Sequence, residues 1–279
     1  MFKQLFSRRR WLYGLLGVVT ALFLHLGNLS PIYSFSWEEL ILRGVQILQL
    51  SHISDEQEVG LGEQINQQLL SEGEVQLADD PQINAYLKEI GQKLAQNSDR
   101  PELPYTFQVV DDESINAFAT MGGFVYIHTG LMVAAANEAE LASVVAHEIG
   151  HLVARHSLKQ MRQRALAEGL LSAAGLDEKI AVQIGVELAL HLPHSRGAEL
   201  EADQLGLANL RQAGYAPLAM VTFMEKLQQQ GGSAPTLLST HPATSDRIVA
   251  LQEQIDPNTA YLGQGLNEQA YKNHIRPLL

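Results

Sequence analysis

The sequence predicts a mostly helical α+β domain in which a small antiparallel sheet lies beside one core helix. Apolar residues recur at helical spacing behind several recognisable helix starts. Two short segments, residues 105–110 and 123–128, show the composition and alternation of strands. Hydrophobic residues make up 46% of the 279 residues, which is enough for a substantial core.

Residues 1–35 predict a basic leader with a signal peptide or signal anchor, and residues 36–279 predict the folded domain. A basic cluster within the first ten residues precedes an uncharged run, residues 11–26, that is short for a membrane-spanning helix. The cluster also resembles a twin-arginine export signal, and a plain basic region is the alternative. We expect export across the cytoplasmic membrane, to the periplasm or to an anchored position that faces outward.

Composition limits the partners and the kind of metal site. The formal net charge of −12 argues against nucleic acid as a partner. The chain contains no cysteine, so neither a disulfide framework nor a thiolate zinc site can form. Any metal would therefore be held by histidine and carboxylate side chains.

Three helix starts divide the first part of the domain. A capping box at Ser36 predicts a helix over residues 37–50, which would pack on the core or lie on a membrane surface. Ser54, followed by Gln57 three residues further on, predicts a second helix that ends at residue 70. Asp80 followed by proline predicts a third, which ends at about residue 96.

The two predicted strands come directly before the helix that carries the most informative motif. A strand in this position suits a sheet edge that binds an extended peptide through its backbone. The alternative is an ordinary structural hairpin, and the spacing alone does not separate the two.

The motif HEIGH, residues 147–151, indicates a metal site. On a helix, His147 and His151 rise from one face and reach the same ion, while Glu148 points toward whatever the metal binds. Asn137, with a glutamate three residues further on, predicts the start of this helix, and an apolar stripe follows. In zinc chemistry the ion activates a water molecule and a nearby carboxylate accepts its proton.

A later helix, capped by Ser195, carries three acidic residues. Glu199 and Asp203 are four residues apart and share a face, whereas Glu201 is turned away and is expected in solvent. A zinc enzyme with two histidines needs a third protein ligand and a group that orients a ligand imidazole, and this spaced pair suits those two roles.

Three further histidines, His128, His156 and His191, each lack a companion at ligand spacing on a shared element. We therefore expect them to be structural or on the surface. Residues 165–193, which are apolar and interrupted by glycine, are expected to form a lid or a cleft wall.

Three motifs follow one another in the chain: HEIGH, then SRGAELEAD, then THPATSDR over residues 240–247. Together they resemble a zinc metallopeptidase family that contains the HtpX-type membrane proteases, the CaaX prenyl proteases and the periplasmic BepA-type proteases. The segment INAFATMGGFVYIHTGLM, residues 115–132, also resembles the family's segment before the metal helix. The resemblance covers residues 54–254, and it implies a zincin-like metallopeptidase domain in a compact exported member.

The resemblance implies a site of the gluzincin type with one Zn²⁺ per chain. His147, His151 and Glu199 would hold the ion. Glu148 would be the catalytic base, and Asp203 would stand behind the ligands and orient one of them.

The resemblance also implies which residues lie next to the bound substrate. His241 would stand over the active site, either occluding the metal or helping to stabilise the oxyanion. The family's substrate-binding edge strand lies in the segment before the metal helix. In this chain the corresponding residues are Asn116, Phe118, Gly123, Phe124, Val125 and Tyr126. Two departures from the family pattern, Met121 for proline and His194 for tyrosine, put substrate preference in question more than activity.

The predicted function is a zinc-dependent endopeptidase that cleaves exported or membrane-associated proteins, mainly misfolded ones. Its partners would be polypeptide substrates, and the membrane if the N-terminal segment is not cleaved; the sequence does not indicate an oligomeric state. The alternative is a zinc-bearing holdase that binds unfolded chains with little cleavage, although a pure binder has no need of Glu148. A hydrolase of non-peptide amides is a weaker third hypothesis.

Overall fold

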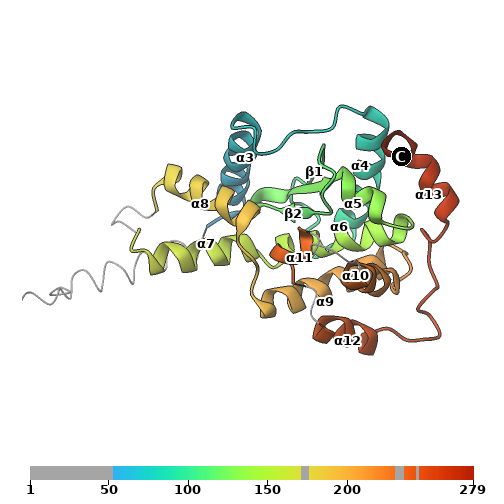
Figure 1. Ribbon diagram of the computed structural model, residues 1–279. Coiled ribbons are helices and arrows are strands. Elements are labelled where there is room, and N and C mark those ends of the chain that lie inside the picture. Colours follow the sequence, from blue (N-terminus) through green and yellow to red (C-terminus); the bar gives the residue numbers. More distant parts are fainter. Residues whose placement is uncertain (1–52, 171–175, 230–235, 243–244) are drawn as a thin grey trace, which may run out of the picture. The chain divides into compact units, whose positions relative to one another are not determined.

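Helices surround a three-stranded sheet in the part of the chain that the computed structural model describes, residues 53–170, 176–229, 236–242 and 245–279 (Figure 1). These residues all belong to one unit of the chain. The predicted leader and the predicted helix over residues 37–50 lie outside the described ranges. Within those ranges, no helix has both the length and the apolar character that crossing a bilayer requires.

The elements alternate between long helices and short strands. The helices are α3 (Asp55–Ser71), α4 (Pro81–Gln96), α5 (Thr129–Ala134), α6 (Glu138–Val153), α7 (His156–Ala167), α8 (Glu178–His191), α9 (Arg196–Gln212), α10 (Ala219–Gln229), α11 (Leu237–Thr240), α12 (Ser245–Gln254) and α13 (Glu268–His274). The strands are β1 (Thr106–Val110), β2 (Ala117–Ala119) and β3 (Phe124–His128). Two short 3-10 turns are η1 (Met121–Gly123) and η2 (Arg276–Leu278).

The helix starts predicted from capping residues are confirmed. Ser54 and Gln57 form a reciprocal capping box at the start of α3. The Asp80 carboxylate accepts hydrogen bonds from two backbone N–H groups of α4, and Asn137 and Ser195 each accept one at the starts of α6 and α9. Each such cap stabilises its helix by about 1 kcal/mol, so local sequence fixes where these helices begin.

The sheet has the order β1-β3-β2 and is mixed. The two strands predicted from the sequence were expected to pair antiparallel, but β1 pairs parallel with β3, and the antiparallel partner of β3 is β2. Strand β2 runs opposite to both of the other strands, so the two strands expected from the sequence, β1 and β3, run in the same direction. Strand β2 has three residues, too few to show an alternating pattern, and the sequence did not predict it. Strand β3 is therefore the central strand.

Helix α6 is the centre of the domain. It packs against β2 and β3 and, more extensively, against α9. Two glycines let the two helices approach closely: a Cβ on Gly150 would lie 2.6 Å from the backbone oxygen of Ala202, and a Cβ on Gly206 would lie 3.0 Å from the backbone nitrogen of His147. The glycine inside HEIGH thus brings the acidic residues of α9 next to the histidines of α6.

The junction between α6 and α7 is held by a buried charge cluster. Arg155 is the non-glycine residue with positive φ in the described part of the chain, at φ 55°, and it turns the chain out of α6. Its Nε donates to the buried carboxylate of Glu58, on α3, across 2.8 Å. Arg100 also pairs with Glu58 at 3.0 Å, and its Nη1 donates to the Leu152 carbonyl at 3.0 Å. The end of the motif helix is therefore tied to α3.

Candidate metal centre

The predicted ligands lie together in the interior. His147 and His151 occupy successive turns of α6, and their Nε2 atoms are 3.0 Å apart. Glu199, in the first turn of α9, places its Oε2 3.5 Å from His147 Nε2 and its Oε1 3.4 Å from His151 Nε2. All three side chains are buried.

His241 supplies a fourth donor atom. It follows α11, and its Nδ1 lies 3.3 Å from His147 Nε2 and 3.2 Å from Glu199 Oε1. The four donor atoms, from His147, His151, Glu199 and His241, all lie within 4.8 Å of one another. A tetrahedral zinc ion with ligands at about 2.0–2.1 Å has neighbouring donors about 3.3 Å apart. The spacing and the N and O chemistry of this cluster therefore fit one zinc ion.

Asp203 stands behind the cluster, on the same face of α9 as Glu199. Its Oδ1 lies 2.9 Å from His147 Nδ1, so Asp203 pairs with this nitrogen and Nε2 is the one directed at the other donors. Arg247 of α12 binds both oxygens of Asp203 at 2.7 Å, and its Nη1 lies 2.6 Å from Glu199 Oε2. Arg247 ends the THPATSDR motif, and nothing in the sequence indicated its role. It is 2% exposed and neutralises the charges of two carboxylates, Asp203 and Glu199.

These contacts set the charges of the ligands. Burial opposes protonation of His147, but hydrogen bonds with Asp203 and Glu199 outweigh it and raise the pKa of His147 to about 10. Burial lowers the pKa of His151 well below its usual range, and the adjacent His194 ring adds to this effect. Burial also opposes ionisation of Glu199, yet its imidazole contacts outweigh burial and lower its pKa. Glu199 and His151 are thus in the anionic and neutral forms that bind a metal.

Glu148 is fully buried beside the cluster. Neither of its carboxylate oxygens accepts a hydrogen bond from the described part of the chain, and Oε1 lies 3.6 Å from His241 Nε2. A buried carboxylate without donors is costly, so such groups mark places where function outweighs stability. This side chain is placed to accept a proton from a water molecule near the cluster.

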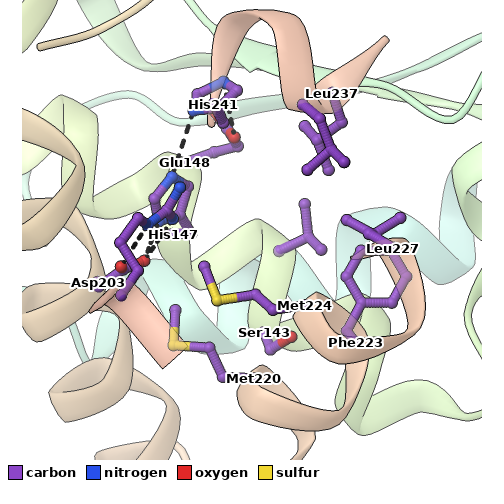
Figure 2. Close-up of a pocket in the computed structure, with 13 residues that line it drawn as sticks. Ser143, His147, Glu148, Asp203, Met220, Phe223, Met224, Leu227, Leu237 and His241 are labelled. Carbon is purple, nitrogen blue, oxygen red and sulfur yellow. Dashed lines mark hydrogen bonds and ion pairs between the residues drawn. The ribbon is translucent and has the colours of Figure 1, made fainter. Parts of the chain in front are cut away.

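An apolar pocket opens next to Glu148, between α6, α10 and α11. The cavity has a volume of about 40 Å³. Figure 2 shows Met220, Met224 and Phe223 along one side, Leu237 on the other, and His147 at one end. The pocket can receive an apolar side chain of a molecule bound at the cluster.

Two histidines lie closer to the cluster than the sequence indicated. His156 was expected to be structural or on the surface, yet it is 4% exposed and its Nδ1 lies 2.9 Å from His151 Nδ1. Its other nitrogen lies 3.1 Å from Glu201, a residue expected only in solvent. His194 stacks on His151 with ring centroids 4.0 Å apart. The link from His156 to His151 was missed because the turn at Arg155 breaks the helical spacing.

The strand predicted to form the substrate-binding edge is not an edge strand in the structure. Phe124, Val125 and Tyr126 lie in β3, whose backbone pairs with β1 on one side and β2 on the other, so these residues do not form an edge. Gly123 ends the η1 turn. The Asn116 carbonyl accepts from His128, and the Phe118 ring stacks on Tyr126 at 4.4 Å.

The edge of the sheet that faces the cluster helix belongs to β2, and it is covered: Ala117 is 0% exposed and Ala119 is 7% exposed. The Thr120 N–H donates to the Phe124 carbonyl, so even-numbered residues of this strand face β3. The backbone groups of Ala117 and Ala119 therefore point the other way, out of the sheet.

Comparison with known proteins identifies the family. The model of peptidase family M48 matches residues 81–255, which include all four donors of the cluster. The chain belongs to this family. The resemblance drawn from the three sequence motifs is confirmed, as is the fold class, and M48 metallopeptidases use zinc.

Relatives of this M48 chain come from bacteria and eukaryotes. The putative beta-barrel assembly-enhancing protease of Vibrio cholerae is 35% identical over 192 residues, which cover 63% of this chain and 40% of that protein. The beta-barrel assembly-enhancing protease of Escherichia coli K12 is 30% identical over 264 residues, 89% of this chain and 52% of that protein. The mitochondrial metalloendopeptidase OMA1 of Arabidopsis thaliana is 34% identical over 184 residues, 64% and 38% of the two chains. The chain spans about half the length, or less, of these curated relatives.

Proposed function

We propose that this M48 chain is a zinc-dependent endopeptidase acting on exported or membrane-associated polypeptides, mainly misfolded ones. The observation that carries the proposal is the position of Glu148, a buried carboxylate without hydrogen-bond donors beside four converging metal donors. A holdase would need neither this carboxylate nor its alignment with a metal. The names of two bacterial relatives link them to β-barrel assembly, which supports a substrate outside the cytoplasm for this chain.

The residues would divide the chemistry as follows. His147, His151 and Glu199 would hold the zinc, which supplies an acidified water molecule and polarises the peptide carbonyl. Glu148 accepts the proton of the attacking water and delivers it to the leaving nitrogen. Asp203 keeps the His147 ring in the tautomer whose Nε2 is bare.

His241 would close the site. Catalytic zinc sites keep one position open for water or substrate, whereas four protein ligands are typical of structural zinc. With His241 Nδ1 at the fourth corner of the cluster, we infer that this side chain occludes the metal and withdraws before catalysis. Of its two predicted roles, occlusion is the one that the donor spacing supports.

The substrate would bind along β2. The outward backbone groups of Ala117 and Ala119 are buried, so an extended peptide would add to them once the segments that cover them withdraw. This mode gives affinity without demanding one side-chain sequence. The Leu237 N–H already donates to the Ile115 carbonyl, at the start of the same edge. Helix α11 thus lies both on the peptide path and next to His241, so that displacing α11 would free the edge and the metal together.

The test is a digest of casein by the purified chain, with and without a chelator, comparing wild type with Glu148→Gln. Loss of a general base lowers turnover by about 10²–10⁴-fold, and zinc content by mass spectrometry should stay at one ion per chain. Glu253→Gln, an exposed substitution on α12, serves as the matched control and should cleave like wild type. Undiminished cleavage by Glu148→Gln, or by the chelated wild type, would contradict the proposal.

A further inference from the structure

A line of hydrogen bonds runs from the surface to one metal-binding imidazole. Glu201 Oε2 lies 3.1 Å from His156 Nε2, and His156 Nδ1 lies 2.9 Å from His151 Nδ1. The side chain of Glu201 is 51% exposed, and His156 is buried. His151 Nε2, at the inner end of the line, faces Glu199 and His147.

The carboxylate at the outer end decides where the protons lie. A carboxylate only accepts hydrogen bonds, so His156 carries its proton on Nε2 and donates it to Glu201. A neutral His156 then has a bare Nδ1, which accepts from Nδ1–H of His151. His151 Nε2 is consequently bare and can bind a metal. In the reverse arrangement His156 would donate through Nδ1, and His151 would carry its proton on Nε2, where it blocks the metal.

We propose that His156 and Glu201 are positioning residues that hold His151 in its metal-binding tautomer. The inference rests on the zinc site proposed above. It gives each ligand imidazole a carboxylate of its own from α9: Asp203 acts on His147 directly, at 2.9 Å, and Glu201 acts on His151 through His156.

The fold explains why the second carboxylate needs an intermediary. Glu201 lies on a different face of α9 from Glu199 and Asp203, so it points toward α7 rather than into the cluster. His156 is the first residue of α7, and the left-handed turn at Arg155 brings it back against His151, five residues earlier. An uninterrupted α6 would place residue 156 on another side of the helix.

The experiment measures zinc dissociation constants by competition with a chelating dye, together with the melting temperature of each metal-free protein. His156→Phe keeps a ring of similar size and removes both nitrogens. His156→Asn returns an acceptor oxygen near the position of Nδ1. Glu201→Ala removes the outer carboxylate at a half-exposed position, and Gln204→Ala, on an exposed part of the same helix, is the matched control.

We expect His156→Phe and Glu201→Ala to weaken zinc binding by about 10- to 100-fold, the usual effect of losing a group that orients a ligand. His156→Asn should recover most of that loss, and Gln204→Ala should match wild type. The metal-free melting temperature of Glu201→Ala should change little, because the lost carboxylate is half exposed and exposed ion pairs contribute little to stability.

Three results would overturn the inference. One is wild-type zinc affinity in Glu201→Ala, which also decides the matter should His156→Phe fail to fold. Another is equal weakening in the Phe and Asn variants, which would indicate packing alone. The third is a loss of affinity that only follows a lower metal-free melting temperature. Failure of wild type itself to bind zinc would instead refute the proposed function, and the inference with it.

Discussion

Gly150→Ala tests whether the close approach of α6 and α9 builds the site. In a helix interior, alanine is more favourable than glycine by about 1 kcal/mol. At Gly150, however, the new Cβ would lie 2.6 Å from the Ala202 carbonyl oxygen, where ordinary contacts begin at 3.4 Å. Helix α9 would therefore have to move away by about 0.8 Å, and overpacking of this kind costs about 1–3 kcal/mol.

The control is Gly60→Ala in α3, where a new Cβ would meet nothing within 4 Å. We expect that variant to gain up to about 1 kcal/mol and Gly150→Ala to fall about 1–3 kcal/mol below it, measured by urea denaturation of the metal-free chains. Because α9 carries Glu199, Gly150→Ala should also lower turnover; a misplacement of about 1 Å can cost on the order of 100-fold. If the two variants were equally stable and equally active, the helix contact would not be what positions the acidic ligand.

Three other predictions concern the cluster and its pocket. His241→Ala should raise the initial rate of peptide cleavage because it opens the fourth metal position, whereas a lower rate would indicate an oxyanion role. Met224→Trp should shift cleavage toward peptides with glycine or alanine next to the scissile bond, since the indole fills the pocket, and zinc content should not change. Zinc binding at pH 7 should release about one proton, because the pKa of His147 is raised to about 10 and the metal-bound ring must be neutral. Calorimetry in buffers of different ionisation enthalpy measures the number of protons released. A heat of binding that does not depend on the buffer would contradict this prediction.

The sequence predicts well the features that depend on local spacing. The helix starts at Ser54, Asp80, Asn137 and Ser195 follow from one side chain and the backbone next to it, and the two histidines of HEIGH need only a helix to meet. Features that depend on how the elements pack against one another were harder to predict from the sequence. Strand β2 is too short for a pattern, and because it lies between β1 and β3 in the chain, missing it also hid that β1 and β3 run parallel.

The contacts around the metal ligands also depend on how the helices pack, so the sequence did not predict them. Arg247 is 44 residues from the Asp203 carboxylate it binds, and nothing in its own surroundings sets it apart from a surface arginine. His156 lies five residues after His151, a separation that an ideal helix does not bring together. Only the backbone turn between α6 and α7 makes it a neighbour, and the arginine at that turn gives no such indication in the sequence.

The pairing of Glu58 with Arg100 and Arg155 has a practical consequence for anyone who expresses part of this chain. The family match begins at residue 81, so a fragment cut there would lose α3 and with it Asp55 and Glu58, the two carboxylates that pair with both guanidinium groups at the end of α6. Two buried or half-buried cations would then face each other without compensation, at the point where the chain reverses toward His156. A usable minimal peptidase should begin before Ser54.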